Sequence, residues 1–206
     1  MRIQNISSNC TFGMTATISK TTLSEVDKKI LQDSHLDQKL KLANLKAINK
    51  ALLYVTNNID KLLDKIVKKN LEKTSKDLEY PKTLIDLAEK NKASHACDLI
   101  PNYKDSNIIL GLEGNPYAVN RGMTVSVTLG DNIVDHYFGF GFDSPIKSKQ
   151  LVKGFKLSLR ELIKPFVEPK VKQLALDAKK LEPEKVDEEF AGALNDLKHA
   201  SDTGHF

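Results

Sequence analysis

The sequence contains no tryptophan, few arginines and only two cysteines among its 206 residues. Cys10 and Cys97 are far apart, belong to no CxxC motif and have no histidines at zinc-site spacing, so the sequence indicates no zinc site. A chain of this length buries about 70% of its unfolded surface and needs no disulfide or metal to fold. Two thiols in such a chain favour a reduced protein, although the sequence leaves open whether they pair.

Long apolar runs and nucleotide-binding glycine loops are also missing. No stretch approaches the ~20 apolar residues of a membrane-spanning helix, and residues 1–10 have no apolar segment typical of a secretory signal. The chain has neither a P-loop sequence nor a complete GxGxxG motif. We therefore expect no cofactor and no metal ion.

The first 24 residues contain no acidic residue and are rich in serine and threonine. Two interpretations fit this composition. One is a first strand followed by a loop, which we favour, and the other is an address for export without a signal peptide. We expect a cytoplasmic protein and keep export as the alternative.

The charge balance is ordinary, with 31 basic and 27 acidic residues and a net charge of +4. Such a balance does not by itself indicate nucleic-acid binding. The only arginines are Arg2, Arg121 and Arg160, whereas bidentate recognition of bases and phosphates is mainly arginine chemistry. We expect a protein partner, with nucleic acid or an anionic lipid as weaker alternatives, and the oligomeric state stays open.

Four segments alternate apolar and polar residues with the period of two that is typical of half-buried strands. They are 11–19, Asn107–Leu112, Gly122–Leu129 and Ile133–Phe142. A short glycine-containing turn at residues 130–132 joins the last two and predicts a β-hairpin. The later three strands are close in sequence, so we expect an antiparallel meander that the first strand joins.

The first half of the chain predicts helices. A capping-box pattern at Thr22 predicts a short helix to about His35, a long helix follows from about Asp37 to Leu71, and a third begins at Pro81. The long helix has apolar residues at seven consecutive a and d heptad positions: Leu45, Ile48, Leu52, Val55, Ile59, Leu62 and Ile66. Glutamate–lysine pairs are missing beside them, so we favour an intramolecular helix over a dimeric coiled coil.

The C-terminal third is also predicted to be helical, and Pro165, Pro169 and Pro183 are expected to divide it into separate helices. The order of elements predicts an α+β fold. Its antiparallel sheet of about four strands, one N-terminal and three central, packs on a long helix of the N-terminal half and on C-terminal helices. We expect a single domain in residues 1–166 and a C-terminal helical extension, 167–206, that is packed on it or partly mobile.

One short segment resembles known sequences. I-Q-N-I-S-S-N-C-T-F-G-M, residues 3–14, resembles the opening of assorted uncharacterised bacterial proteins that begin I-x-x-I, then Asn, then Phe-Gly. The resemblance covers about a dozen residues of the chain. It implies a bacterial source and an N-terminal strand, and it implies no activity.

A lysine-rich stripe lies beside the apolar face of the helix predicted at 144–166. Its members are Lys149, Lys153, Lys156, Arg160 and Lys164. The segment 177–202, in contrast, has eight acidic residues and four lysines. Two interpretations follow: a solvated face partly neutralised by the acidic tail, which is the commoner case, or a surface for an anionic partner.

A second candidate surface is the outer face of the sheet, which is expected to be small and polar. Its candidate residues are Thr124, Ser126, Thr128, Tyr137, Gly139 and Gly141. Alternation places the opposite residues, His136, Phe138, Phe140 and Phe142, in the core. Such an outer face suits water, a covering helix or a partner.

Candidate catalytic residues are few. A small enzyme would need a cleft near the 130–142 hairpin, using Asp135, His136 or Tyr137 with Arg121 and Glu113. Neighbouring strand residues point to opposite faces, so Asp135 and His136 form no simple acid–base pair.

His95 and Cys97 form the other candidate pair, and they lack a third group to orient them. A buried, inert Cys97 is favoured. We interpret the chain as a non-catalytic binding or interaction protein of bacterial type that uses the lysine-rich helix or the sheet face. A small enzyme and an exported effector are the alternatives.

Overall fold

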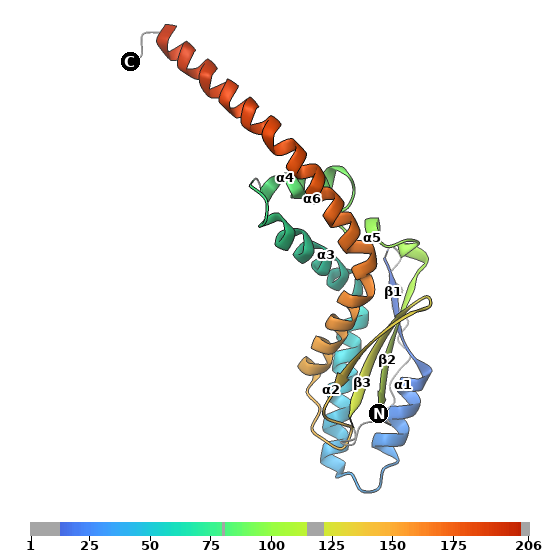
Figure 1. Ribbon diagram of the computed structural model, residues 1–206. Helices are drawn as coiled ribbons and strands as arrows, with labels where there is room; N and C mark the ends of the chain where they lie inside the picture. The colour runs from blue at the N-terminus through green and yellow to red at the C-terminus, as the bar shows by residue number, and fades with distance from the viewer. Residues whose placement is uncertain (1–12, 80, 115–121, 203–206) are drawn as a thin grey trace.

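The computed structural model of the chain describes residues 13–79, 81–114 and 122–202. The protein has the predicted α+β class, with a four-stranded sheet and long helices packed on it (Figure 1). The elements are β1 (Thr15–Ile18), α1 (Lys20–Val26), η1 (Asp27–Leu31, π-helical), α2 (Gln38–Asn57), α3 (Ile59–Ser75), α4 (Pro81–Lys90), α5 (Ala96–Leu99), η2 (Tyr103–Asp105, 3-10), β2 (Asn107–Gly114), β3 (Met123–Leu129), β4 (Asn132–Phe138) and α6 (Ser148–Asp202).

The strands lie in the order β1-β2-β3-β4. The predicted meander is confirmed, because β2, β3 and β4 pair antiparallel. Strand β1 differs from the expected antiparallel arrangement, since it pairs with β2 in parallel. The chain passes through helices α1 to α5 and the helical segments η1 and η2 between these two strands, and a long crossover of this kind allows β2 to run in the same direction as β1.

The inner face of the sheet carries the apolar residues that alternation predicted. The buried residues on this face are Met14, Ala16, Ile108, Leu110, Leu112, Met123, Val125, Val127 and Leu129. Helix α2 packs against β1, and helix α6 packs against β3 and β4 (Figure 1). Burial of each large apolar side chain contributes about 1.5–3 kcal/mol, so the core between the sheet and these two helices is the main source of stability.

Strand β4 ends earlier than predicted, at Phe138, whereas the sequence placed its end at Phe142. Phe142 is nevertheless buried, and Phe138 and Phe140 are partly buried against the core. Because the strand has ended, Gly139 and Gly141 do not belong to the outer sheet face, and the prediction that they do is wrong. Gly139 is exposed in the following turn.

Asn44 holds the turn between β4 and α6 in place. Its buried side-chain amide donates to the carbonyl oxygens of Phe142 (2.8 Å) and Ser144 (2.9 Å) and accepts from the backbone N–H of Ile146 (2.9 Å). All three bonds reach from α2 to the segment that leads into α6. This one side chain therefore fixes where α6 begins.

The long helix predicted at 37–71 is two helices, because it is interrupted at Asn58. The Asn58 backbone leaves the helical region, and its side-chain amide donates to the carbonyl of Tyr54 at 2.8 Å, replacing the lost backbone bond. Asparagine competes for backbone groups in this way and disfavours helix interiors. Six of the seven heptad residues are buried and Ile66 is partly buried, all within one chain, as the favoured interpretation predicted.

Helix α1 begins one turn before the predicted cap. The Ser19 hydroxyl, not that of Thr22, accepts the capping bond, and it does so from the Thr22 N–H at 3.0 Å. The Thr22 hydroxyl instead accepts from the N–H of Leu112 at 2.7 Å. Helix α1 thus caps the part of the β2 edge that extends past β1.

Helix α6 is continuous for 55 residues, so the prediction that three prolines divide it is wrong. Pro165 and Pro169 are exposed and four residues apart, so the carbonyls that they leave unbonded lie on the solvent side, where water satisfies them. Side chains around them, Ile163, Val167 and Val171, are buried and hold the helix in place.

Two parts of α6 differ in their surroundings. We call residues 148–178 the embedded part, because buried side chains recur up to Ala178. Residues 179–202 are the projecting part, which extends away from the rest of the protein (Figure 1). The helix crosses residue 166 without a break, and the division into a domain of residues 1–166 and an extension of residues 167–206 stays a prediction.

Candidate functional site

The main candidate site is a groove between α3 and α6, with a volume of about 530 Å³. Seven basic residues line it, and we call it the basic groove: Lys65, Lys69, Lys73 and Lys76 from α3 and its end, and Lys153, Lys156 and Arg160 from α6. All seven side chains are exposed. Glu72 is the one acidic residue in the lining, and its carboxylate lies 4.0 Å from Lys68 Nζ. The groove therefore presents a strongly positive surface.

Apolar side chains lie among these charges. Leu62 is buried, Ile66 is partly buried and Leu157 is 36% exposed. In the sequence, Leu157 lies among the basic residues and interrupts the polar face of its helix. In the folded protein this side chain completes the apolar part of the lining, so the basic groove has both charged and apolar contacts to offer.

Close packing of α6 on the sheet determines where its lysines lie. A Cβ atom at Gly154 would lie 2.5 Å from the ring of Phe138 and 3.0 Å from Val125 Cγ2, so only glycine lets the helix approach this closely. With this side of the helix against the sheet, Lys153 and Lys156 face the margin toward α2 and α3. The close packing of α6 on the sheet at Gly154 thus helps to determine where the α6 side of the basic groove lies.

The positive surface continues past the groove along α2. A second hollow of about 480 Å³ is lined by Lys50, Tyr54 and Lys149 and shares Lys153 and Lys156 with the basic groove. Lys156 Nζ lies 5.5 Å from the centre of the Tyr54 ring, a cation–π contact that joins α6 to α2.

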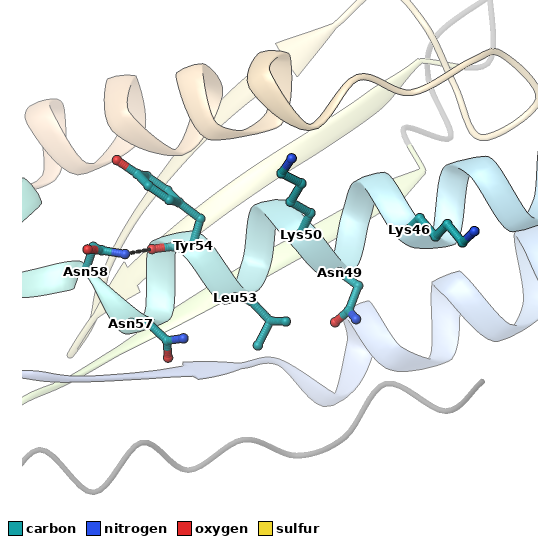
Figure 2. Close-up of a pocket in the computed structure, with 7 residues that line it drawn as sticks. All are labelled: Lys46, Asn49, Lys50, Leu53, Tyr54, Asn57 and Asn58. Atoms are coloured by element: carbon teal, nitrogen blue, oxygen red, sulfur yellow. Dashed lines mark hydrogen bonds between the residues drawn. The ribbon is translucent and has the colours of Figure 1, made fainter.

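A third hollow follows the exposed side of α2. It measures about 430 Å³ and shares Lys50 and Tyr54 with the second one (Figure 2). Figure 2 shows Tyr54 and Lys50 directed toward α6, whereas Asn49, Leu53 and Asn57 lie on the other side of the helix. The three hollows therefore form one continuous surface over α2, α3 and α6.

The five basic residues predicted from the sequence separate into two groups. Lys149, Lys153, Lys156 and Arg160 line the connected hollows. Lys164 does not, because its ammonium is 3.3 Å from Glu161 and 4.0 Å from Glu168 on the same helix. These partners neutralise Lys164, which makes it a part of the ordinary solvated surface.

The half of the basic groove that comes from α3 was not predicted from the sequence. Lys65, Lys69, Lys73 and Lys76 follow one another at steps of four, four and three, which places them along one side of a helix. From this spacing a lysine stripe on α3 could have been predicted. What the sequence did not indicate is that the stripe on α3 lies beside the stripe on α6.

The outer sheet face is the second candidate surface. Thr124, Ser126 and Thr128 line a hollow of about 390 Å³ together with Glu113 and Asp135. Tyr137 lies on the same face and is 47% exposed. A Cβ at Gly111 would collide with the Ser126 hydroxyl, so a larger residue there would require the Ser126 side chain to move. The hollow carries two carboxylates and small hydroxyl groups.

The residues proposed for catalysis are divided between the two faces of the sheet, because Glu113, Asp135 and Tyr137 lie on the outer face and His136 does not. Asp135 lines the outer hollow, whereas His136 lies on the inner face, where its ring centre is 5.0 Å from that of Phe138 in a T-shaped arrangement. Arg121 lies outside the described residues. Asp135 and His136 therefore point to opposite faces of β4 and do not form an acid–base pair.

Cys97 is exposed, so the prediction of a buried cysteine is wrong. Its pKa is raised, first by partial burial of the thiol and then by Asp98 and Asp64, which lowers its nucleophilicity at neutral pH. His95 Nδ1 lies 3.4 Å from Asp64 Oδ2 rather than beside the thiol. The pair therefore lacks the geometry of a catalytic dyad, and Cys10 lies outside the described residues.

The other shifted group is structural. The Tyr103 hydroxyl donates to Asp60 Oδ1 at 2.6 Å, and the same oxygen accepts from the N–H of Met14 at 2.9 Å. Burial of Tyr103 and this bond raise its pKa. Asp60 thereby ties the start of α3 to the start of β1 and to Tyr103 in η2.

The part of the chain that the structure describes has neither a metal-binding cluster nor a membrane-spanning helix. No cluster of histidine, cysteine and acidic side chains there is placed to hold a metal ion. None of the helices described is long and apolar enough to cross a membrane.

Comparison with known proteins gives no relatives. The chain matches no protein-family model, and no curated protein and no solved structure matches it significantly. The chemistry of its surfaces is therefore what indicates its function.

Proposed function

We propose that the protein is a non-catalytic binding protein whose basic groove holds an acidic, amphipathic helix of a protein partner. The observation that carries the proposal is the mixed lining, in which seven basic residues surround apolar side chains between two helices. An amphipathic helix laid into such a groove buries its apolar side on the floor, as in other helix-in-groove complexes. The acidic residues of the partner helix then lie next to the lysines along the sides of the groove. This charge complementarity favours an acidic partner over a neutral or basic one and speeds association.

Nucleic acid fits this lining less well. Arg160 is the only arginine among the seven basic residues. In the described part of the chain, Tyr54 is the single aromatic residue that lines the three connected hollows. Recognition of single strands depends on several stacking rings, and recognition of phosphates depends largely on arginine.

A membrane surface also fits less well. A helix that lies in a membrane interface inserts its apolar side among the lipids. In α6 that side is used by the core, because Leu151, Phe155 and Leu159 are fully buried. At the basic groove, α6 therefore presents Leu157 and basic residues of the lysine-rich stripe to a partner.

A direct test compares three probes by fluorescence anisotropy at low and high salt. They are an acidic helical peptide with leucines on one side, a scrambled peptide of equal charge, and a single-stranded DNA oligonucleotide. We expect the amphipathic peptide to bind most tightly and to be weakened by salt, because its contacts are partly ionic. The variant Lys69→Glu/Lys156→Glu/Arg160→Glu should bind it about tenfold or more weakly, since three attractive pairs of about 0.2–1 kcal/mol become repulsive.

The matched control is Lys20→Glu/Lys28→Glu/Lys39→Glu, which changes the net charge equally at exposed residues outside the three hollows. It should bind the peptide nearly as well as the unchanged protein. Equal binding of the scrambled peptide, tighter binding of DNA, or equal losses in both variants would contradict the proposal.

A further inference from the structure

Exposed apolar side chains recur along the projecting part of α6. Among its described side chains none is buried, and Phe190 and Leu194 are 71% and 44% exposed. Leu176, just before it, is 57% exposed. At 100° per residue these three side chains fall within about 40° of arc, so they form one apolar stripe.

A helix of this kind gains little stability alone. Isolated helices are marginal in water, and most helical stability in proteins comes from packing of one face. A stripe that carries a phenylalanine and two leucines with no cover is typical of a surface that another chain covers.

The charge of this region is opposite to that of the basic groove. Residues 177–202 contain eight acidic residues and four lysines, whereas the groove has seven basic residues and one acidic residue. The described acidic residues Asp187, Glu188, Glu189 and Asp196 are all exposed. The helix end therefore has both properties that the groove requires, an apolar stripe and acidic side chains.

The groove of the same chain is out of reach. Lys153, Lys156 and Arg160 belong to the same continuous helix as the acidic end. The end cannot turn back to them unless the helix unfolds between the two parts. Only a second copy of the chain can bring its acidic end to this groove.

We propose that the projecting part of α6 docks into the basic groove of a second copy of the chain. This inference rests on the proposed function, because it names the chain itself as one source of the acidic helix. The projecting part is roughly 36 Å long at 1.5 Å per residue, which is enough to follow the groove along α3. Reciprocal docking gives a closed pair, and one-way docking gives rings or filaments.

Sedimentation of the full chain over a range of concentrations, at low and high salt, tests the proposal. Self-association at low salt should be lost in the groove variant Lys69→Glu/Lys156→Glu/Arg160→Glu. It should equally be lost in the tail variant Asp187→Lys/Glu188→Lys/Glu189→Lys. Both substitution sets in one chain should restore it, and so should mixing the two single-site variants, because opposite charges then face each other again.

A neutral variant tests the apolar contact. Phe190→Ser/Leu194→Ser should weaken self-association about tenfold or more while the circular dichroism of the helices stays close to that of the unchanged protein. A chain that stays monomeric at every concentration, or a combined variant that is not restored, would overturn the inference. The proposed function fails separately, when the acidic amphipathic peptide does not bind the groove of the monomeric tail variant.

Discussion

The embedded and projecting parts of α6 belong to one helix, yet different interactions stabilise them. In the embedded part, Leu151, Phe155, Leu159, Ile163 and Val167 are fully buried against the sheet and the other helices. In the projecting part the described side chains are exposed or partly exposed. Tertiary packing stabilises the first part, whereas the second depends on its local sequence and on any partner that covers it.

The embedded part contains two prolines that do not interrupt the helix. Pro165 and Pro169 lie in the embedded part, where the cost of about 3 kcal/mol for an interior proline is offset by the buried residues on both sides. Their exposed position also leaves the unbonded carbonyls accessible to water. Helix continuity at Pro165 and Pro169 is therefore supported by burial on both sides, against the local preference of proline.

Replacing phenylalanine by alanine in each part should give the largest contrast. Phe155→Ala removes a fully buried ring and should lower the free energy of unfolding by about 3–5 kcal/mol. Phe190→Ala removes a ring that is 71% exposed and should change it by less than about 0.5 kcal/mol. Urea unfolding at high salt, where association is weakest, measures both.

Each of the two phenylalanine variants serves as a control for the other. Both substitutions delete the same atoms from the same helix, so helix propensity changes equally in the two variants. If Phe190→Ala destabilises the monomer by an amount similar to Phe155→Ala, the projecting part is packed against the protein and the difference between the two parts does not exist.

The start of the embedded part should be the next most sensitive position. Asn44→Ala removes three hydrogen bonds to the turn at 142–146 and leaves buried backbone groups without partners, so it should cost about 2–4 kcal/mol. Asn70→Ala is the control, because its amide bonds only to Ile66 in its own helix and its loss should cost less than about 1 kcal/mol. Equal losses in urea unfolding would mean that Asn44 does not anchor α6.

Period-two and heptad patterns predicted much of the fold from the sequence. Met123, Val125 and Val127 are buried, Thr124 and Ser126 line the outer hollow, and the α+β class follows from the order of such segments. These predictions succeed because they depend on which side of one element is apolar, and neighbouring residues determine that.

The remaining features depend on contacts between distant segments. The break at Asn58 turns α3 out of the line of α2, and Gly154 sets the distance of α6 from the sheet. Together they place Lys69 beside Arg160 in one groove. Each lysine stripe was visible as spacing, but no local pattern indicates that two stripes about ninety residues apart in the chain meet.

Two glycines of α6 give a finer test of the difference between its parts. Gly154→Ala gains about 1 kcal/mol of helix propensity. It also forces a methyl group to within 2.5 Å of the Phe138 ring, an overpacking that costs about 1–3 kcal/mol. The net effect in urea unfolding should be a loss of up to about 2 kcal/mol, with weaker peptide binding if α6 shifts.

Gly192→Ala has no such conflict, because a Cβ there meets nothing within 4 Å. No overpacking offsets the gain of about 1 kcal/mol in helix propensity. We therefore expect amide hydrogen exchange around residue 192 to slow several-fold. Global stability should hardly change, since the projecting part opens without unfolding the core. If Gly154→Ala were also stabilising, the close approach of α6 to the sheet would not be what holds its lysines at the groove. If Gly192→Ala destabilised the chain, the projecting part would have a packed neighbour within the same molecule.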